Sequence, residues 1–220
     1  MKPAVFVFDA YGTLFDVHTA VRRHGAAVGP DAAALSDLWR AKQLEYTWVR
    51  SLMRVRRDFW VITGEALDYA LARFPAVDKR MRDPLLQAYL SLDAYPEVPG
   101  VLAALKRGGA RLAILSNGTR DMLSAAVASS GIGGHLDAVL SIDEAGVFKT
   151  DPRVYQLVLD RLRVAPTEVS FQSANRWDVA GATAFGFRSV WVNRTGQPDE
   201  YKDCPPAAVI ATLADLAKLP

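Results

Sequence analysis

The feature that most constrains this chain is an apolar run near its start that ends in an aspartate. Val5–Phe8 leads directly into Asp9, and Gly12 lies in the turn beyond it. A continuous run of Val and Phe that ends at a turn is typical of a strand buried on both faces, as in a parallel sheet. Open α/β sheets bind ligands at the carboxyl ends of such strands. Asp9 is therefore a candidate carboxylate nucleophile; alternatively, it only caps the strand or the next helix.

The residues around this aspartate resemble a known motif. The segment 9–14, Asp-Ala-Tyr-Gly-Thr-Leu, is similar to the first motif of the haloacid dehalogenase superfamily, and its Tyr11 resembles the 2-haloacid dehalogenase branch. Phosphatases of that superfamily usually carry a second Asp at this place, as general acid and as part of a magnesium site. Tyr11 therefore argues against phosphoryl transfer.

Size and composition indicate a globular protein with a sizeable core, because 220 residues with 50% apolar side chains can bury one. The formal charge is only +2 and the arginines are scattered, so we expect no nucleic-acid surface. A solvated helix face explains the one basic cluster, which consists of Arg50, Arg54, Arg56 and Arg57.

The compartment is predicted from cysteine usage and from the apolar runs. The single Cys204 excludes an intrachain disulfide and fits a reducing compartment. The apolar run before Asp9 is too short for a signal peptide. No window approaches the ~18 apolar residues of a membrane span. We therefore expect a cytoplasmic protein without membrane contact.

From 15 to 92 the chain has helical periodicity and no convincing strand. One amphipathic helix is expected near its start, with Asp31 or Ser36 as a cap. The predicted buried face of this helix runs through Leu35, Leu38, Trp39, Leu44, Trp48 and Leu52. Further helices are expected at 59–74 and at 83–92, where Pro84 suits a first turn. This block is interpreted as an inserted all-helical cap domain.

Beyond residue 93 strands and helices alternate. We expect strands at 5–8, 111–115, 138–141, 169–172 and 189–193, helices at 101–107, 120–129, 152–163 and 179–186, and a short strand and helix within 209–216. Such alternation predicts an α/β fold with a doubly wound parallel sheet. The resemblance implies a Rossmann-like catalytic core at 1–14 and 93–220 and a helical cap at 15–92.

Three of the predicted strands end in polar residues. These endings are Asp9 with Thr13, Ser116 with Asn117, and Ser173 with Asn175 and Asp178. Each Ser-Asn pair alone is more often turn chemistry. Because the carboxyl ends of parallel strands share one edge of the sheet, the three endings together predict a site.

Two further segments match the superfamily. Phe148-Lys149-x-x-Pro152 is similar to its lysine motif, in which the ammonium stands beside the nucleophile and offsets its repulsion of an anionic substrate. Otherwise, Lys149 would be a solvated residue near a helix start. The segment 173–182 is close to the fourth motif of the dehalogenase branch. It holds only one acid, Asp178, so we predict that the protein binds no metal and needs no cofactor.

The cap segment 38–46 resembles the dehalogenase cap helix. Its Arg40 is implied to contact the halogen and the substrate carboxylate, and a guanidinium suits that task because it stays charged and offers a fork of donors. Relatives often have Gln directly after that arginine, where this chain has Ala41. Other side chains implied in substrate binding are Tyr11, Leu44, Phe59, Ser116, Asn117 and Trp177. Phe59 and Trp177 are equally explained as core residues.

The resemblance implies hydrolysis of short (S)-2-haloalkanoic acids to (R)-2-hydroxyalkanoic acids and halide. Asp9 attacks the α-carbon and forms an ester, which water then opens at the carboxyl carbon of Asp9. Asp178, Asn175 and Ser173 are expected to position Lys149 and the water; either Asp178 or Lys149 takes the water's proton.

The partners implied are a 2-haloacid, halide and a second copy of the chain, with Leu52 as a candidate contact. The alternatives are a magnesium-dependent phosphatase or phosphonatase of the same superfamily, and a catalytically silent binding protein.

Overall fold

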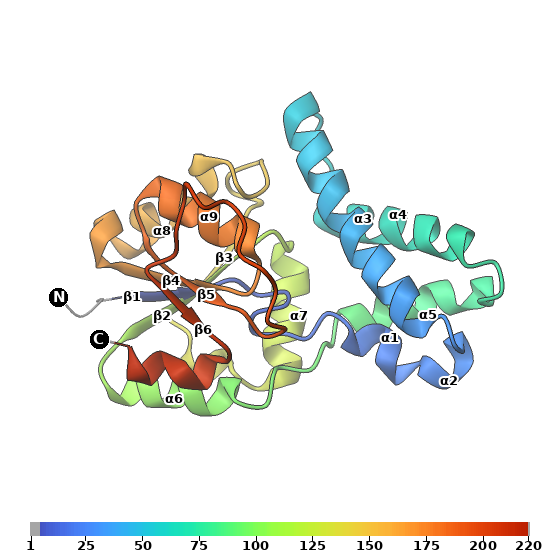
Figure 1. Ribbon diagram of the computed structural model, residues 1–220, viewed down its shortest axis with the longest axis horizontal. Coiled ribbons are helices and arrows are strands. Elements are labelled where there is room, and N and C mark those ends of the chain that lie inside the picture. Colours follow the sequence, from blue (N-terminus) through green and yellow to red (C-terminus); the bar gives the residue numbers. More distant parts are fainter. Residues whose placement is uncertain (1–4, 220) are drawn as a thin grey trace.

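Six parallel strands form the sheet at the centre of the larger part of the molecule (Figure 1). The computed structural model describes residues 5–219. The strands are β1 (Val5–Phe8), β2 (Arg111–Ser116), β3 (Ala138–Ser141), β4 (Val169–Ser173), β5 (Arg188–Val192) and β6 (Ala208–Ile210). Their order is β3-β2-β1-β4-β5-β6, so β1 lies between β2 and β4. Chain order reverses across β1, and this is where a doubly wound sheet opens a ligand crevice.

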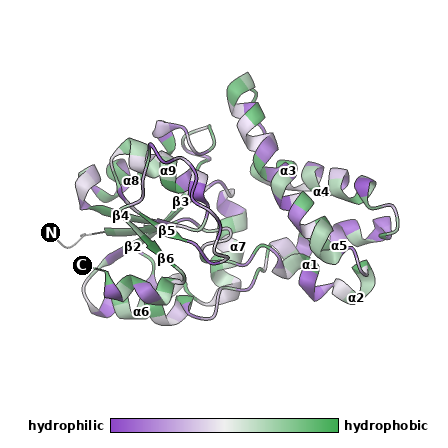
Figure 2. Cartoon of the chain, in the orientation of Figure 1, coloured by the Kyte–Doolittle hydropathy of each residue, from purple (hydrophilic) through white to green (hydrophobic). Residues whose placement is uncertain are grey.

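Helices cover both faces of this sheet. The core helices are α6 (Val98–Arg107), α7 (Arg120–Ser130), α8 (Pro152–Leu162) and α9 (Arg176–Phe185), with short 3-10 turns η2 (Gly133–His135), η3 (Pro166–Glu168) and η4 (Leu213–Lys218). Figure 1 shows α8 and α9 on one side of the sheet and α6 and η4 on the other. Figure 2 shows the strands as mostly hydrophobic and these helices as mixed, as expected when each helix buries one face. The predicted doubly wound parallel sheet is confirmed.

The segment between β1 and α6 forms a separate helical layer (Figure 1). It contains α1 (Thr19–Arg23), α2 (Gly25–Val28), α3 (Ala32–Met53), α4 (Phe59–Arg73), η1 (Lys79–Met81) and α5 (Arg82–Tyr89). All of these helices lie within the range 15–92 predicted for the cap. Pro84 is in the first turn of α5, as expected.

Ser36 or Asp31 was predicted as the N-cap residue of the long helix α3. Ser36 is not the N-cap residue, and Asp31 occupies that position without its side chain capping the helix. Ser36 lies inside α3, where its Oγ is 2.8 Å from Nδ1 of His18. Asp31 occupies the N-cap position, but its side chain makes no capping hydrogen bond. The helix therefore begins without the side-chain cap that its sequence suggested.

The predicted buried face of α3 is wrong beyond its midpoint. Leu35 and Trp39 are buried, but the later buried positions are Gln43 and Thr47. Trp48 is 37% exposed and Leu52, which the pattern placed inside, is 85% exposed. The end of α3 extends past the other cap helices, and none of residues 5–219 covers it (Figure 1). Figure 2 shows hydrophobic colour at this end.

The helix α9 begins three residues before the predicted range 179–186. Its first turn is polar, which hid it from a periodicity argument. Consequently Asn175 lies at the N-cap position, and Trp177 and Asp178 are in the first turn. The polar residues after β4 are thus held by a helix rather than by a loop.

Candidate active site

The three polar strand endings converge at one edge of the sheet, because β2, β1 and β4 are neighbours. Asp9 follows β1 at the centre and is 5% exposed. Its backbone N–H donates to the carbonyl of Gln172 at 2.9 Å, which continues the pairing of β1 with β4. The carboxylate is therefore carried by rigid backbone at the reversal point of the sheet.

Oδ2 of Asp9 accepts hydrogen bonds from three side chains. Thr13 Oγ1 donates at 3.1 Å, Asn175 Nδ2 at 2.8 Å and Ser173 Oγ at 3.4 Å. The expectation that Asn175 and Ser173 position Lys149 is wrong in this respect, since both side chains reach Asp9 instead. They orient the carboxylate because Asn175 sits at the N-cap of α9 and Ser173 ends β4.

The other oxygen of Asp9, Oδ1, accepts a hydrogen bond from Lys149 Nζ at 3.1 Å. The same ammonium donates to Asp178 Oδ2 at 2.7 Å. Lys149 is 1% exposed, so this is a buried cluster of one cation between two carboxylates. Burial alone would lower the pKa of Lys149, but Asp178 and Asp9 outweigh it and raise that pKa.

The loop that delivers Lys149 is held at both ends. Asn117 Oδ1 accepts a hydrogen bond from the backbone N–H of Lys149 at 2.9 Å. Asp151 caps α8, since its Oδ1 accepts from the backbone N–H of Arg153 at 2.9 Å and Pro152 occupies the first turn. A lysine near a helix start is ordinarily solvated. These contacts instead direct the Lys149 side chain towards Asp9 at the edge of the sheet.

Asp178 has a second partner that the sequence did not suggest. Tyr155 on α8 donates its O–H to Asp178 Oδ1 at 2.8 Å. Burial raises the pKa of Asp178 to about 6, against the opposing effect of Lys149. Tyr155 lies in a predicted helix and on its apolar face, so no local signal marks it as a partner of an acid.

The cap reaches this cluster through Arg40 on α3. Arg40 Nη2 donates to the carbonyl oxygen of Tyr11 at 3.3 Å and to Asn175 Oδ1 at 3.4 Å. Its Nη1 donates to Gln43 Oε1 at 2.7 Å, and that oxygen also accepts from Tyr89 at 3.1 Å. Arg40 thus lies between cap and core and contacts Asn175, which itself donates to Asp9.

Aromatic rings form one wall of the site. The Tyr11 ring stacks on Tyr89 at 5.5 Å and lies 6.1 Å from the ring of Phe59, which in turn is 6.1 Å from Phe148. Phe59 is 1% exposed, so it is a buried residue of the core and at the same time part of this aromatic wall. The Tyr11 hydroxyl is buried without a hydrogen-bond partner in the described part of the chain.

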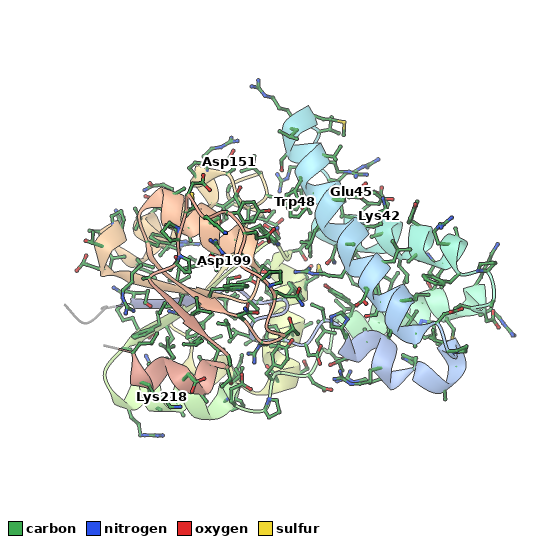
Figure 3. All side chains as sticks on the ribbon, viewed as in Figure 1. Lys42, Glu45, Trp48, Asp151, Asp199 and Lys218 are labelled. Carbon is green, nitrogen blue, oxygen red and sulfur yellow. The ribbon has the colours of Figure 1, made fainter. Side chains whose placement is uncertain are left out.

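The remaining cap position, Leu44, is half-buried on α3 one turn after Arg40. One further turn along α3, the ring of Trp48 meets Trp177 of α9 edge-on at 5.5 Å. Figure 3 shows Trp48 on the core side of α3, away from Lys42 and Glu45. The cap and the core therefore share an aromatic contact beside the site.

The turn after β2 is closely packed. Ser116 Oγ accepts a hydrogen bond from the backbone N–H of Gly118 at 3.1 Å. A Cβ at Gly118 would lie 2.8 Å from Cε2 of Tyr11, so only glycine fits there. Ser116 and Asn117 thus border the site, but the side-chain contacts of both are to the backbone.

Within residues 5–219, no group of three or more His, Cys, Asp or Glu side chains is arranged to hold a metal ion. The neighbour of Asp9 is the ammonium of Lys149 rather than a further carboxylate. Over the same residues, no helix is long and apolar enough to cross a membrane.

Residues 3–186 match the haloacid dehalogenase-like hydrolases. The chain belongs to this family. This hydrolase is 48% identical over 214 residues to (S)-2-haloacid dehalogenase 1 of Pseudomonas sp. strain CBS-3, with 97% of this chain and 94% of the relative covered. It is 48% identical over 211 residues to (S)-2-haloacid dehalogenase 4A of Burkholderia cepacia, with 96% and 91% covered.

Solved structures agree with the sequence relatives. The L-2-haloacid dehalogenase of Xanthobacter autotrophicus with covalently bound chloropropionic acid superimposes on this hydrolase with a TM-score of 0.90 at 38% identity, covering 100% of this chain and 98% of that one. The predicted superfamily, branch and inserted helical cap are therefore confirmed.

Proposed function

We propose that this hydrolase converts short (S)-2-haloalkanoic acids to (R)-2-hydroxyalkanoic acids and halide, through an ester at Asp9 and without a metal ion. The observation that carries the proposal is the paired setting of Asp9: one oxygen faces an ammonium and the other faces three neutral donors. Such a carboxylate is held in one orientation beside a positive charge, which suits a nucleophile. The names of the relatives agree with this reaction.

In the first step Asp9 attacks the α-carbon of the substrate. Among residues 5–219, Oδ2 accepts three side-chain hydrogen bonds and Oδ1 accepts one, from Lys149, so Oδ1 keeps a lone pair free to attack. A bond forms between Oδ1 and the α-carbon while the carbon–halogen bond breaks and halide leaves with its electrons. Attack from the face opposite the halogen inverts the centre, which gives the (R)-product from the (S)-substrate.

We assign the departing halide to the cap side of the site. Arg40 keeps a charged fork of donors there, and Trp177 and Asn117 lie on the facing core segments. The turn at Ser116 and Asn117 is assigned to the substrate carboxylate, with its backbone N–H groups as donors. The aromatic wall that includes Tyr11 and Phe59, together with Leu44, is assigned to the substrate's alkyl group.

In the second step water attacks the carboxyl carbon of Asp9 and releases the hydroxy acid. Lys149 has a raised pKa, so at neutral pH it is protonated and has no lone pair to take a proton. Asp178, with its pKa raised to about 6, is ionised at neutral pH and basic enough to accept the water's proton. We therefore assign the general base to Asp178 and the charge stabilisation to Lys149.

The decisive experiment is a single turnover in heavy-oxygen water. Because the ester opens at the Asp9 carboxyl carbon, the label should appear in Asp9, and the first hydroxy acid released should carry none. Label in the first product would exclude the ester. Asp9→Asn should abolish halide release while the protein stays folded, because an amide is a far weaker nucleophile.

The reaction class is tested by substrate and metal together. Halide release from (S)-2-chloropropionate that persists with a chelator, with no release from the (R)-enantiomer, supports the proposal. Magnesium-dependent release of phosphate from a generic phosphate ester would support the rival phosphatase. Absence of both activities would favour a binding protein.

We also propose that two copies of the chain associate in the cytoplasm. The end of α3 exposes Trp48, Val49, Leu52 and Met53, and Val55 just beyond it is exposed as well. Apolar side chains gathered on an uncovered helix end are typical of an association surface. Leu52→Glu should lower the mass measured by light scattering from that of a dimer to that of a monomer; an unchanged mass would refute this assignment.

A further inference from the structure

Two segments join the cap to the core, and they run side by side. The outgoing segment follows Asp9 and the returning segment precedes α6. They pair in antiparallel fashion: the backbone N–H of Asp16 donates to the carbonyl of Asp93 at 2.9 Å, and that of Tyr95 to the carbonyl of Leu14 at 3.0 Å. Any movement of the cap relative to the sheet must pass through this pair.

Arg194, two residues after β5, touches both segments from the core side. Its Nη2 donates to the carbonyl oxygen of Thr13 on the outgoing segment at 2.8 Å. Its Nη1 forms an ion pair with Glu97 Oε1 at 2.6 Å, at the end of the returning segment. The guanidinium also lies 3.7 Å from the ring centroid of Tyr95. One side chain thus binds both linkers.

The chemistry of these contacts requires arginine. A planar guanidinium can donate in two directions while it stacks on a ring, whereas a lysine ammonium is a point charge without a stacking face. Both partners of the ion pair are largely buried, with side-chain exposures of 15% for Arg194 and 19% for Glu97. Burial alone would raise the pKa of Glu97, but the hydrogen bond and the charge of Arg194, together with hydrogen bonds from the Glu97 backbone and from Thr212, outweigh burial and lower that pKa.

We propose that Arg194 is a positioning residue that clamps both linkers to the core and thereby sets where α3 presents Arg40 to the site. The bonds of Arg40 to Tyr11 and Asn175, at 3.3 and 3.4 Å, are already near the limit for hydrogen bonds. A cap shift of a few tenths of an ångström would break them. Arg40 and Arg194 also line the same cavity of about 460 Å³.

Loss of Arg194 could lower activity by two routes: through the cap and Arg40, or through Thr13. Its carbonyl binds Arg194, and its hydroxyl donates to Asp9, so loss of Arg194 could act on the nucleophile directly. The two routes differ in one respect. Only the cap route runs through Arg40, so only that route makes the effect of Arg194 depend on what stands at position 40.

The first test compares Arg194→Met with Arg194→Lys and with a matched control, Arg111→Met. Arg111 also donates to a backbone carbonyl, that of Leu162 at 2.8 Å, but at the opposite end of the sheet. In Arg194→Met we expect amide hydrogens of the linker pair, at 16 and 95, to exchange faster than in the wild type. Arg111→Met should leave that exchange unchanged. Equal exchange in all variants would overturn the clamp.

The second test is kinetic and rests on the proposed function. For (S)-2-chloropropionate we expect kcat/KM to fall between about tenfold and about a hundredfold in Arg194→Met, as misplacement by up to about 1 Å allows. Arg194→Lys should recover part of this loss, and Arg111→Met should stay within about twofold of the wild type. A loss in Arg194→Met no larger than in Arg111→Met would overturn the inference.

A double-mutant cycle separates the two routes. In an Arg40→Lys background, in which the fork of donors is already lost, Arg194→Met should cost much less than it does in the wild type. An equal cost in both backgrounds would assign the effect to Thr13 and refute the cap route. If the wild type releases no halide, the proposed function fails, but the exchange experiment still tests the clamp.

Discussion

Replacement of Lys149 by methionine is the perturbation that most directly tests the charge arrangement at the site. Methionine keeps most of the unbranched side chain and removes the charged ammonium. It leaves Asp9 and Asp178 without the ammonium that lies 3.1 and 2.7 Å from them. Both carboxylates are buried, so water cannot replace the lost partner.

The size of the effect follows from these distances. Two unit charges 3.1 Å apart interact by about 5 kcal/mol at an effective dielectric constant near 20. Loss of that stabilisation in the attack step corresponds to a fall in halide release of about 10³-fold or more. For folding, removal of one partner of a buried pair costs about 3–5 kcal/mol, because an uncompensated charge remains.

The stability loss should depend on pH, with a definite sign. The folded pKa of Asp178 is raised to about 6 from 3.8, so the stability its protonation contributes is present at low pH and is lost as pH rises through about 6. Lys149 lowers the pKa of Asp178 in the wild type and so limits that loss. In Lys149→Met this effect is absent and the pKa of Asp178 rises further, so the difference in unfolding free energy should be larger at about pH 8 than at about pH 4.5, by about 1.4 kcal/mol or more.

The assay is urea unfolding of wild type and Lys149→Met at both pH values, with halide release measured in parallel. Lys106→Met is the matched control, because Lys106 forms a 2.8 Å ion pair with Asp137 in which each side chain is about a third exposed. We expect it to cost about 1 kcal/mol or less. A pH-independent loss in Lys149→Met, or halide release within about tenfold of the wild type, would refute the reasoning.

Two further outcomes are expected. Halide release by the wild type should decline as pH falls through about 6, because Asp178 becomes protonated; Tyr155→Phe removes a bond that lowers the pKa of Asp178, so the decline should begin at higher pH. A pH profile that is the same for Tyr155→Phe and the wild type would contradict this. Gly118→Ala should lose about 1–3 kcal/mol in chemical unfolding, because its Cβ would meet Tyr11. Gly134→Ala, with nothing within 4 Å, is the control and should show no such loss.

Part of the site could be predicted from the sequence because its signals are local. The apolar run into Asp9, the polar endings of the next strands and the residues around Lys149 each lie within a few positions of one another. Periodicity also located the strands and most helices to within a few residues, since burial on one face imposes it. Family resemblance then placed Arg40 and Asp178 in the same site.

Contacts between distant segments were outside that reach. Tyr155 lies in α8 and Arg194 follows β5, and neither residue belongs to a recognisable motif. Their hydrogen-bond partners, Asp178 and Thr13, are far away in the chain. The exposed end of α3 was mispredicted for a related reason. The apolar spacing that includes Leu52 is the same whether a neighbour covers that face or none does, and only the packed structure shows which.

The sequence by itself determined the fold class, the candidate nucleophile and the residue types around it, because these depend on local pattern and on side-chain chemistry. The tertiary structure decided which oxygen of Asp9 meets which donor, and it brought Lys149, 140 positions away, to within 3.1 Å. The physical reason is the order of strands in the sheet: it sets which strand endings are neighbours, and no spacing along the chain encodes that order.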